Sequence, residues 1–255
     1  GGGGAVIHIE NKPMSVGSYP IVIGQGGIGD VPGDVALLAS ITGGTTTFDG
    51  YSATGGGGAS AYSNQETPSG GANSGGRGAY FDNTSGQPAP TAPSNQDAYD
   101  TVHAGFVGGH FRGASNYPSG GGAGAGENGQ TPGSGSSNGG VGGDGIQIDI
   151  DGNNYFWGGG GGGAIYDNDT GNGGPGGNGG GGAGQDNAAG GAGYNAGGSS
   201  AAYTGTASDD VIGEQGNGGA NTGGGGGGAC YNYGPSSSYT AGNGGSGIVI
   251  IRYAI

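Results

Sequence analysis

Long apolar side chains occur along this chain only in short runs, separated by glycine and polar residues. Two runs rich in β-branched residues, 18–23 (SYPIVI) and 247–253 (GIVIIRY), predict β-strands. Pro20 cannot donate a ladder hydrogen bond, so the first strand is expected at a sheet edge or to pair only after that residue. Weaker strand candidates are residues 5–10, 45–48 and 146–150. No segment has a helical period long enough to predict a helix.

Glycine tracts fill much of the sequence between these runs. Glycine supplies 78 of the 255 residues. The longest tracts are residues 1–4, 55–58, 158–163, 179–182 and 223–228. A collagen helix is excluded, because glycine does not recur at every third position and only 11 residues are proline. The irregular spacing of the tracts also excludes a solenoid of fixed period.

The composition excludes an ordinary aliphatic core. Hydrophobic residues make up 30% of the chain, even with alanine, tyrosine and cysteine counted. Disorder is one alternative, but the 14 tyrosines and the 9% content of charged residues favour an ordered chain. Extended three-residue-per-turn glycine helices can lie side by side and bond through their backbones. The predicted fold is therefore mostly irregular and β, a bundle of polyglycine-II-like helices capped by a small β-sheet.

Charge and cysteine content exclude several classes of function. Four basic residues face 18 acidic ones, which gives a formal net charge of −14. Nucleic-acid binding needs clustered Lys and Arg, so we expect no nucleic-acid partner. Cys230 is the only cysteine, so no intrachain disulfide can form. The longest run of large aliphatics has four residues, so we expect no membrane insertion.

Motifs for catalysis or cofactor binding fail in their context. Residues 24–29 (GQGGIG) fit a dinucleotide-binding pattern, but proline and glycine interrupt the helix that should follow. Residues 135–139 (GSSNG) fit a nucleophile elbow without the strand and helix that it needs. Residues 149–153 begin like a calcium loop but lack its glycine and its final glutamate. We therefore expect no enzyme activity, no cofactor and no metal site.

Several landmarks resemble a known family. They are residues 16–24 (VGSYPIVIG), 44–48 (GTTTF), 155–163 (YFWGGGGGG) and the closing 244–253 (GGSGIVIIRY). In this order they resemble the glycine-rich domain of bacteriophage tail fibres and tail-tip receptor-binding adhesins. The resemblance implies one domain over residues 1–255, in which the N- and C-terminal strands pair. It also implies a missing strand upstream of residue 1 and a loop-rich insert at about residues 59–117.

Aromatic residues in the loops are the candidate binding residues. Tyrosine offers a large contact area and a polar tip, which suits the recognition of glycans or proteins. A role in covering the glycine bundle is the equal alternative for these side chains. The candidates are Tyr62, Tyr80, Tyr99, Phe106, His110, Tyr117, Tyr194, Tyr203, Tyr231, Tyr233 and Tyr239.

The resemblance implies host-receptor recognition, with a cell-surface glycan or outer-membrane protein as the partner. It also implies an extracellular or virion location and contacts with other virion or appendage subunits, among them further copies of this chain. The alternative is a structural subunit of an extracellular filament, sheath or capsid fibre, since exposed strand edges can pair between chains.

Overall fold

A computed structural model describes residues 1–29, 41–59, 71–76, 93, 97–111, 117–133, 135–165, 171–185, 188, 190–193, 195–199, 216–229 and 241–253. Over these ranges the chain has short strands and irregular extended segments, and no helix. No helix able to cross a bilayer is therefore found in them. The fold is mostly irregular and β, as predicted.

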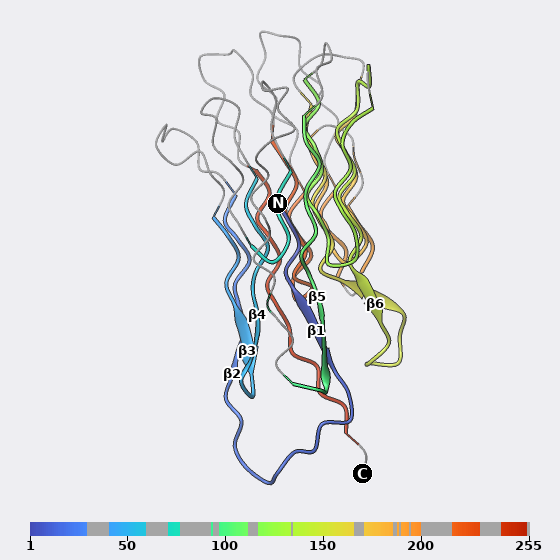
Figure 1. Ribbon diagram of the computed structural model, residues 1–255. Coiled ribbons are helices and arrows are strands. Elements are labelled where there is room, and N and C mark those ends of the chain that lie inside the picture. The colour runs from blue at the N-terminus through green and yellow to red at the C-terminus, as the bar shows by residue number, and fades with distance from the viewer. Residues whose placement is uncertain are drawn as a thin grey trace.

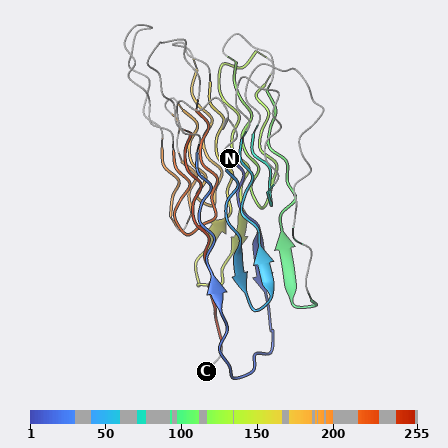
Figure 2. The same cartoon turned by 90° about the vertical axis from the view of Figure 1, so that its left-hand side faces the viewer.

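The extended segments run side by side along one long axis, and the strands gather toward one end of it (Figure 1). The C-terminal end of the chain lies at this strand end, whereas the N-terminus lies midway along the molecule (Figures 1 and 2). The strands are β1 (Val6–Ile9), β2 (Ile21–Val22), β3 (Thr46–Phe48), β4 (Tyr51–Ala53), β5 (Asp100–His103), β6 (Ile146–Ile148) and β7 (Tyr155–Trp157).

β3 and β4 form a tight hairpin beside the short strand β2. The two turn residues, Asp49 and Gly50, have φ angles of 46° and 85°. Two successive left-handed residues match the twist of the flanking strands, and Asp-Gly is a favoured pair for them. Phe48 is thereby placed opposite Tyr51. β2 pairs with β3 only from Ile21 onward, directly after Pro20, as the proline predicted.

Two further antiparallel pairs complete the strand end. β1 pairs with β5, with Val6 opposite His103 and Ile9 opposite Asp100. β6 pairs with β7, and the indole Nε1 of Trp157 donates to the carbonyl of Ile148 at 3.3 Å. Since β5 falls within residues 59–117, part of that stretch belongs to the strand end.

The predicted pairing of N- and C-terminal strands is wrong. β1 pairs with β5, and residues 247–253 form no strand. The closing segment does approach the chain after β2, because Gly244 N donates to Gly27 O and Gly247 N to Gly24 O. These bonds recur every three residues, whereas a β-ladder to one neighbour has a period of two. A strand register is therefore never established there.

The glycine segments are joined by backbone hydrogen bonds with the same period of three. Segment 158–163 is the clearest case, since every N–H donates and every carbonyl accepts. Its donor bonds are Gly158 to Thr222, Gly159 to Gly179, Gly160 to Gly143, Gly161 to Gly1, Gly162 to Gly182 and Gly163 to Gly140. Its carbonyls accept from Ala125, Gly225, Gly177, Gly122, Gly228 and Gly174, in chain order. Residues three apart along the segment mostly bond to the same neighbouring segment.

Close approach of backbones explains why these positions are glycine. A Cβ on Gly160 would lie 2.2 Å from the carbonyl oxygen of Gly122, and one on Gly162 would lie 1.8 Å from that of Gly174. Real Cβ contacts essentially never fall below 3.0 Å. Any side chain would therefore separate the segments and break their hydrogen bonds.

Few large side chains are fully buried in the described part of the chain. Asn73 and Ser74 are completely buried. Their side chains form hydrogen bonds with backbone groups of neighbouring segments. The Asn73 amide donates to the carbonyls of Gly3 and Gly4, and its oxygen accepts from Phe106 N. The interior is thus held mainly by hydrogen bonds between backbone polar groups.

Candidate functional site

A cavity of about 880 Å³ opens at the strand end. β1, β2, the β3–β4 hairpin and the closing segment line it, together with Ile148, Ile150 and Trp157. Many of the lining side chains are aliphatic or aromatic, and Ile21 and Ile251 are about half exposed. Concave, mostly apolar surfaces of this size are typical of ligand sites.

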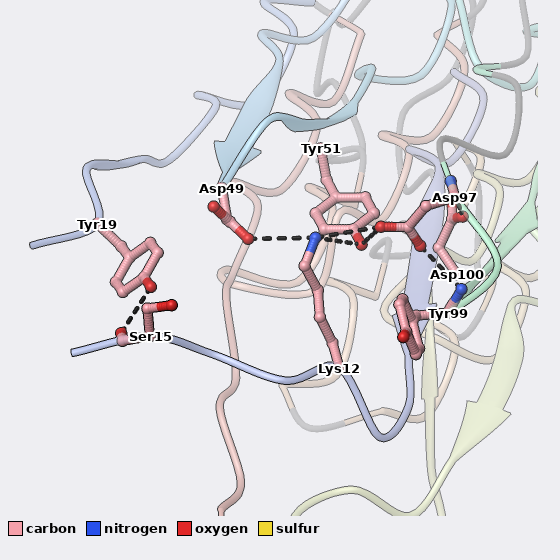
Figure 3. Close-up of polar contacts among 8 residues, drawn as sticks. All are labelled: Lys12, Ser15, Tyr19, Asp49, Tyr51, Asp97, Tyr99 and Asp100. Carbon is pink, nitrogen blue, oxygen red and sulfur yellow. Dashed lines mark hydrogen bonds and ion pairs between the residues drawn. The ribbon is translucent and has the colours of Figure 1, made fainter. Parts of the chain in front are cut away.

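Lys12 occupies the rim of this cavity at the centre of a polar cluster (Figure 3). Its Nζ donates to the Tyr51 hydroxyl at 2.7 Å and forms ion pairs with Asp49 at 3.2 Å and Asp97 at 3.1 Å. The Tyr51 hydroxyl in turn donates to Asp97 Oδ2 at 2.5 Å. The ammonium group also lies 4.2 Å from the centre of the Tyr51 ring.

The cluster is positioned by three separate parts of the chain. Lys12 follows β1, Tyr51 begins β4 after the Asp49–Gly50 turn, and Asp97 precedes β5. Asp97 is fixed because its Oδ1 accepts from Tyr99 N at 2.8 Å and its own N donates to Asp100 Oδ1 at 3.0 Å. The cluster therefore ties the β1–β5 pair to the β3–β4 hairpin.

The protonation states of the cluster reinforce one another. The hydrogen bond to Tyr51, followed by those to Asp97 and Asp49, raises the pKa of Lys12. The hydrogen bond from Tyr51, followed by that from Tyr99 N, lowers the pKa of Asp97. Burial, followed by the bond to Asp97, raises the pKa of Tyr51. All three shifts favour a charged lysine, a charged aspartate and a neutral tyrosine, which are the states that strengthen the hydrogen bonds and ion pairs of the cluster.

A second pair of titratable side chains lies on the β1–β5 ladder. His8 and His103 sit on adjacent strands, and burial, followed by the charge of His8, lowers the pKa of His103. The other neighbour of His8 is Glu10, whose carboxylate is 3.9 Å from His8 Nε2. In the described ranges no three His, Cys, Asp or Glu side chains are grouped so that they could hold a metal ion.

The structure describes four of the candidate aromatic residues and does not gather them. Tyr99 is exposed beside the Lys12 cluster at the strand end (Figure 3). Phe106, His110 and Tyr117 come after β5, where the chain leaves the strand end. His110 Nδ1 lies 3.0 Å from the Thr131 hydroxyl, and the Tyr117 ring stacks on Phe111 at 6.1 Å between centroids.

The other candidates, Tyr62, Tyr80, Tyr194, Tyr203, Tyr231, Tyr233 and Tyr239, lie outside the described residues. The prediction of these receptor-binding residues stays a prediction.

Sequence reasoning missed both the cavity and the Lys12 cluster. Two signals could have pointed to the cluster: Lys12 is the only lysine of the chain, and Asp49-Gly50 is a strong hairpin turn signal. Asp97 carries no local signal for this cluster, because its cluster partners Tyr51 and Lys12 lie more than forty residues away in the sequence.

Comparison with known proteins identifies a family. Neither the curated proteins nor the solved structures gave a match to this chain. A family model described as "Glycine-rich domain" matches residues 1–254. The match covers nearly the full length, including the glycine segments and all seven strands. The chain therefore belongs to this glycine-rich domain family.

Proposed function

We propose that this chain is a rigid display domain, built as a bundle of polyglycine-II-like helices, that recognises a host receptor at the tip of a phage tail fibre or a similar surface appendage. The observation that carries the proposal is the three-residue period of the backbone hydrogen bonds. In a helix with three residues per turn, successive N–H groups point about 120° apart, so each donates to a different neighbour.

Segment 158–163 supports this description of the bundle. Its hydrogen bonds join it to six neighbouring segments, which gives the sixfold surroundings of a close-packed array. Each buried bond contributes about 0.5–1.5 kcal/mol net, so stability comes from many weak bonds acting together. A lattice of this kind holds its connecting segments in fixed positions without an aliphatic core.

A rigid bundle suits recognition because little conformational freedom remains to be lost on binding. The partner proposed is a cell-surface glycan or outer-membrane protein, and the location is extracellular or on the virion. Among the described residues, Tyr117, which is 37% exposed, and His110 favour this use, and the buried Phe111 ring supports Tyr117 by stacking on it. No catalytic role is proposed.

Adsorption to host cells tests the proposal. Particles or purified chain carrying Tyr117→Ala together with His110→Ala should adsorb less than the unchanged form. Tyr253→Ala is the matched control, since Tyr253 is more exposed at 78% but belongs to the strand end. Equal loss in both variants, or no loss in either, would count against recognition through the residues beyond β5.

A structural role in a filament, sheath or capsid fibre is the second candidate, and the state of β2 favours it. Ile21 and Val22 are 47% and 55% exposed on successive positions, so both faces of this strand are uncovered. Exposed apolar strands of this kind pair readily with another chain. Electron micrographs of the assembled protein distinguish the two, because a structural subunit gives a helical or ring-shaped polymer and a recognition domain gives a discrete knob.

A further inference from the structure

Six extended segments form a closed ring around the cavity. Each is hydrogen-bonded through its backbone to the next, and neighbours around the ring are antiparallel. In order, the segments are residues 1–5, 54–58, 41–44, 24–29, 241–247 and 223–227. The bonds that close the ring are Gly2 N to Gly57 O, Gly43 N to Gly56 O, Gly44 N to Gln25 O, Gly244 N to Gly27 O, Gly245 N to Gly224 O and Gly4 N to Gly223 O. Residues of all six segments line the cavity.

A ring of six contacting rods has room for one rod of the same diameter at its centre. Elsewhere in the chain that central place is filled: segment 158–163 exchanges hydrogen bonds with neighbours on all sides. Within the ring the place is open space. The cavity therefore has the cross-section of one missing extended glycine segment.

Two glycines of the ring, Gly1 and Gly4, have more room around them than the glycines of the filled array. A Cβ on Gly1 or Gly4 would find no atom nearer than 3.4 Å or 3.6 Å respectively. At Gly160 and Gly162, in a filled part of the array, the nearest atoms stand at 2.2 Å and 1.8 Å. Gly1 and Gly4 are one turn apart in a three-residue helix, so they form one face of segment 1–5 on which an added methyl group would make only ordinary van der Waals contacts.

Polar groups on the ring lack partners. Gly226 and Gly56 both line the cavity, and they are buried and half-buried respectively. In the described part of the chain, no group accepts a hydrogen bond from the N–H of either residue. Buried groups of this kind are normally paired, so they favour an occupant that offers backbone donors and acceptors.

Beyond the ring the cavity continues into the apolar surface of the strand end. Phe48, Trp157 and the aliphatic residues of the closing segment line this part. A fitting occupant thus has two halves: a glycine tract for the ring and a short apolar strand for the surface beyond it. Residues 1–9 of this chain, GGGGAVIHI, have that composition themselves.

We infer that this cavity binds an extended segment of a partner polypeptide, consisting of a glycine tract continued by an apolar strand. A second copy of this chain is disfavoured, because its described glycine tracts are already bonded in its own array and two chains of charge −14 repel. A small apolar molecule would leave the backbone groups of the ring unsatisfied. The inference rests on the packing proposed above but not on receptor recognition.

A labelled peptide GGGGAVIHI, titrated with the full chain and followed by fluorescence anisotropy, tests this inference. We expect saturable binding. The peptide AAAAAVIHI should fail to bind, because its methyl groups cannot enter a ring spaced for glycine. If the peptide AVIHI bound as tightly as GGGGAVIHI, the glycine tract would contribute nothing to binding, and the inference would be overturned. So would sedimentation showing that the free chain is a dimer whose dissociation is needed before the peptide binds.

Two variants of the chain test the site itself. Gly4→Leu directs a side chain into the ring and should weaken peptide binding roughly tenfold or more while the chain still unfolds at an unchanged denaturant concentration. Thr54→Val is the control, because the Thr54 hydroxyl is sealed from solvent and has no partner among the described residues, so its removal should leave both the stability of the chain and peptide binding unchanged. Unchanged binding by folded Gly4→Leu would contradict the inference. The packing is tested separately by Gly162→Ala, described below, so a failure of either can be recognised.

Discussion

Adding one methyl group to Gly162 should destabilise the chain strongly. The new Cβ would lie 1.8 Å from Gly174 O, the carbonyl that accepts from Gly184 N at 2.9 Å. Relief to an ordinary contact needs a movement of more than about 1 Å, which breaks that bond. Overpacking costs about 1–3 kcal/mol, and an unsatisfied buried carbonyl costs about 1–3 kcal/mol. We expect Gly162→Ala to lower the free energy of unfolding by about 3 kcal/mol.

Urea unfolding followed by tryptophan fluorescence measures this change. Trp157 is the only tryptophan and is 4% exposed, so its emission reports on the folded state. For a chain of this size the melting temperature should fall by about 6–12 °C. The control is Gly4→Ala, whose Cβ meets nothing nearer than 3.6 Å and which should leave stability unchanged or raise it by up to about 1 kcal/mol. The reasoning is refuted if Gly162→Ala is as stable as this control.

Three other changes test separate parts of the structure. Asn73→Ala leaves the Gly3 carbonyl and Phe106 N without their partner, so it should cost about 2–4 kcal/mol in urea unfolding, whereas Asn153→Ala on the surface should cost nothing measurable. The lowered pKa of Asp97 contributes stability that is present above pH 3.8 and is lost as the pH falls through the folded-state pKa. Tyr51→Phe removes the hydrogen bond from the tyrosine, so it should raise the pKa of Asp97, which carboxyl-carbon NMR measures. An unchanged pKa of Asp97 would contradict the role of Tyr51 in the cluster. The lowered pKa of His103 likewise contributes stability that is present above pH 6.5 and is lost as the pH falls through the folded-state pKa. On mild acidification His103→Gln should therefore lose less stability than the natural chain. Parallel profiles of stability against pH for the two chains would contradict this.

Local sequence pattern found several of the strands but few of their partners. Residues 5–10 and 45–48 were recognisable from their β-branched residues and became β1 and β3. β4 was missed although Asp49-Gly50 marks its hairpin, because Tyr51–Ala53 is too short and mixed to show a period. β5 was missed because its pairing with β1 joins residues more than ninety positions apart.

The closing segment shows why an apolar run is not enough to predict a strand. Residues 247–253 have strong β propensity, yet they enter from a glycine tract whose bonds repeat every three residues. The bonds of the preceding tract, three residues apart at Gly244 and Gly247, do not match the two-residue period of a β-ladder, and the β propensity of the side chains does not overcome this mismatch. In the same way, no composition could indicate that six tracts enclose a vacant place, since that depends on which tracts become neighbours.

Scalar couplings across hydrogen bonds, measured by NMR on uniformly labelled protein, test the central claim most directly. The three-residue period predicts couplings from Gly160 N to the Gly143 carbonyl and from Gly163 N to the Gly140 carbonyl, with slow amide exchange throughout residues 158–163. Absence of these couplings, together with exchange at the rate of an unstructured chain, would contradict the account.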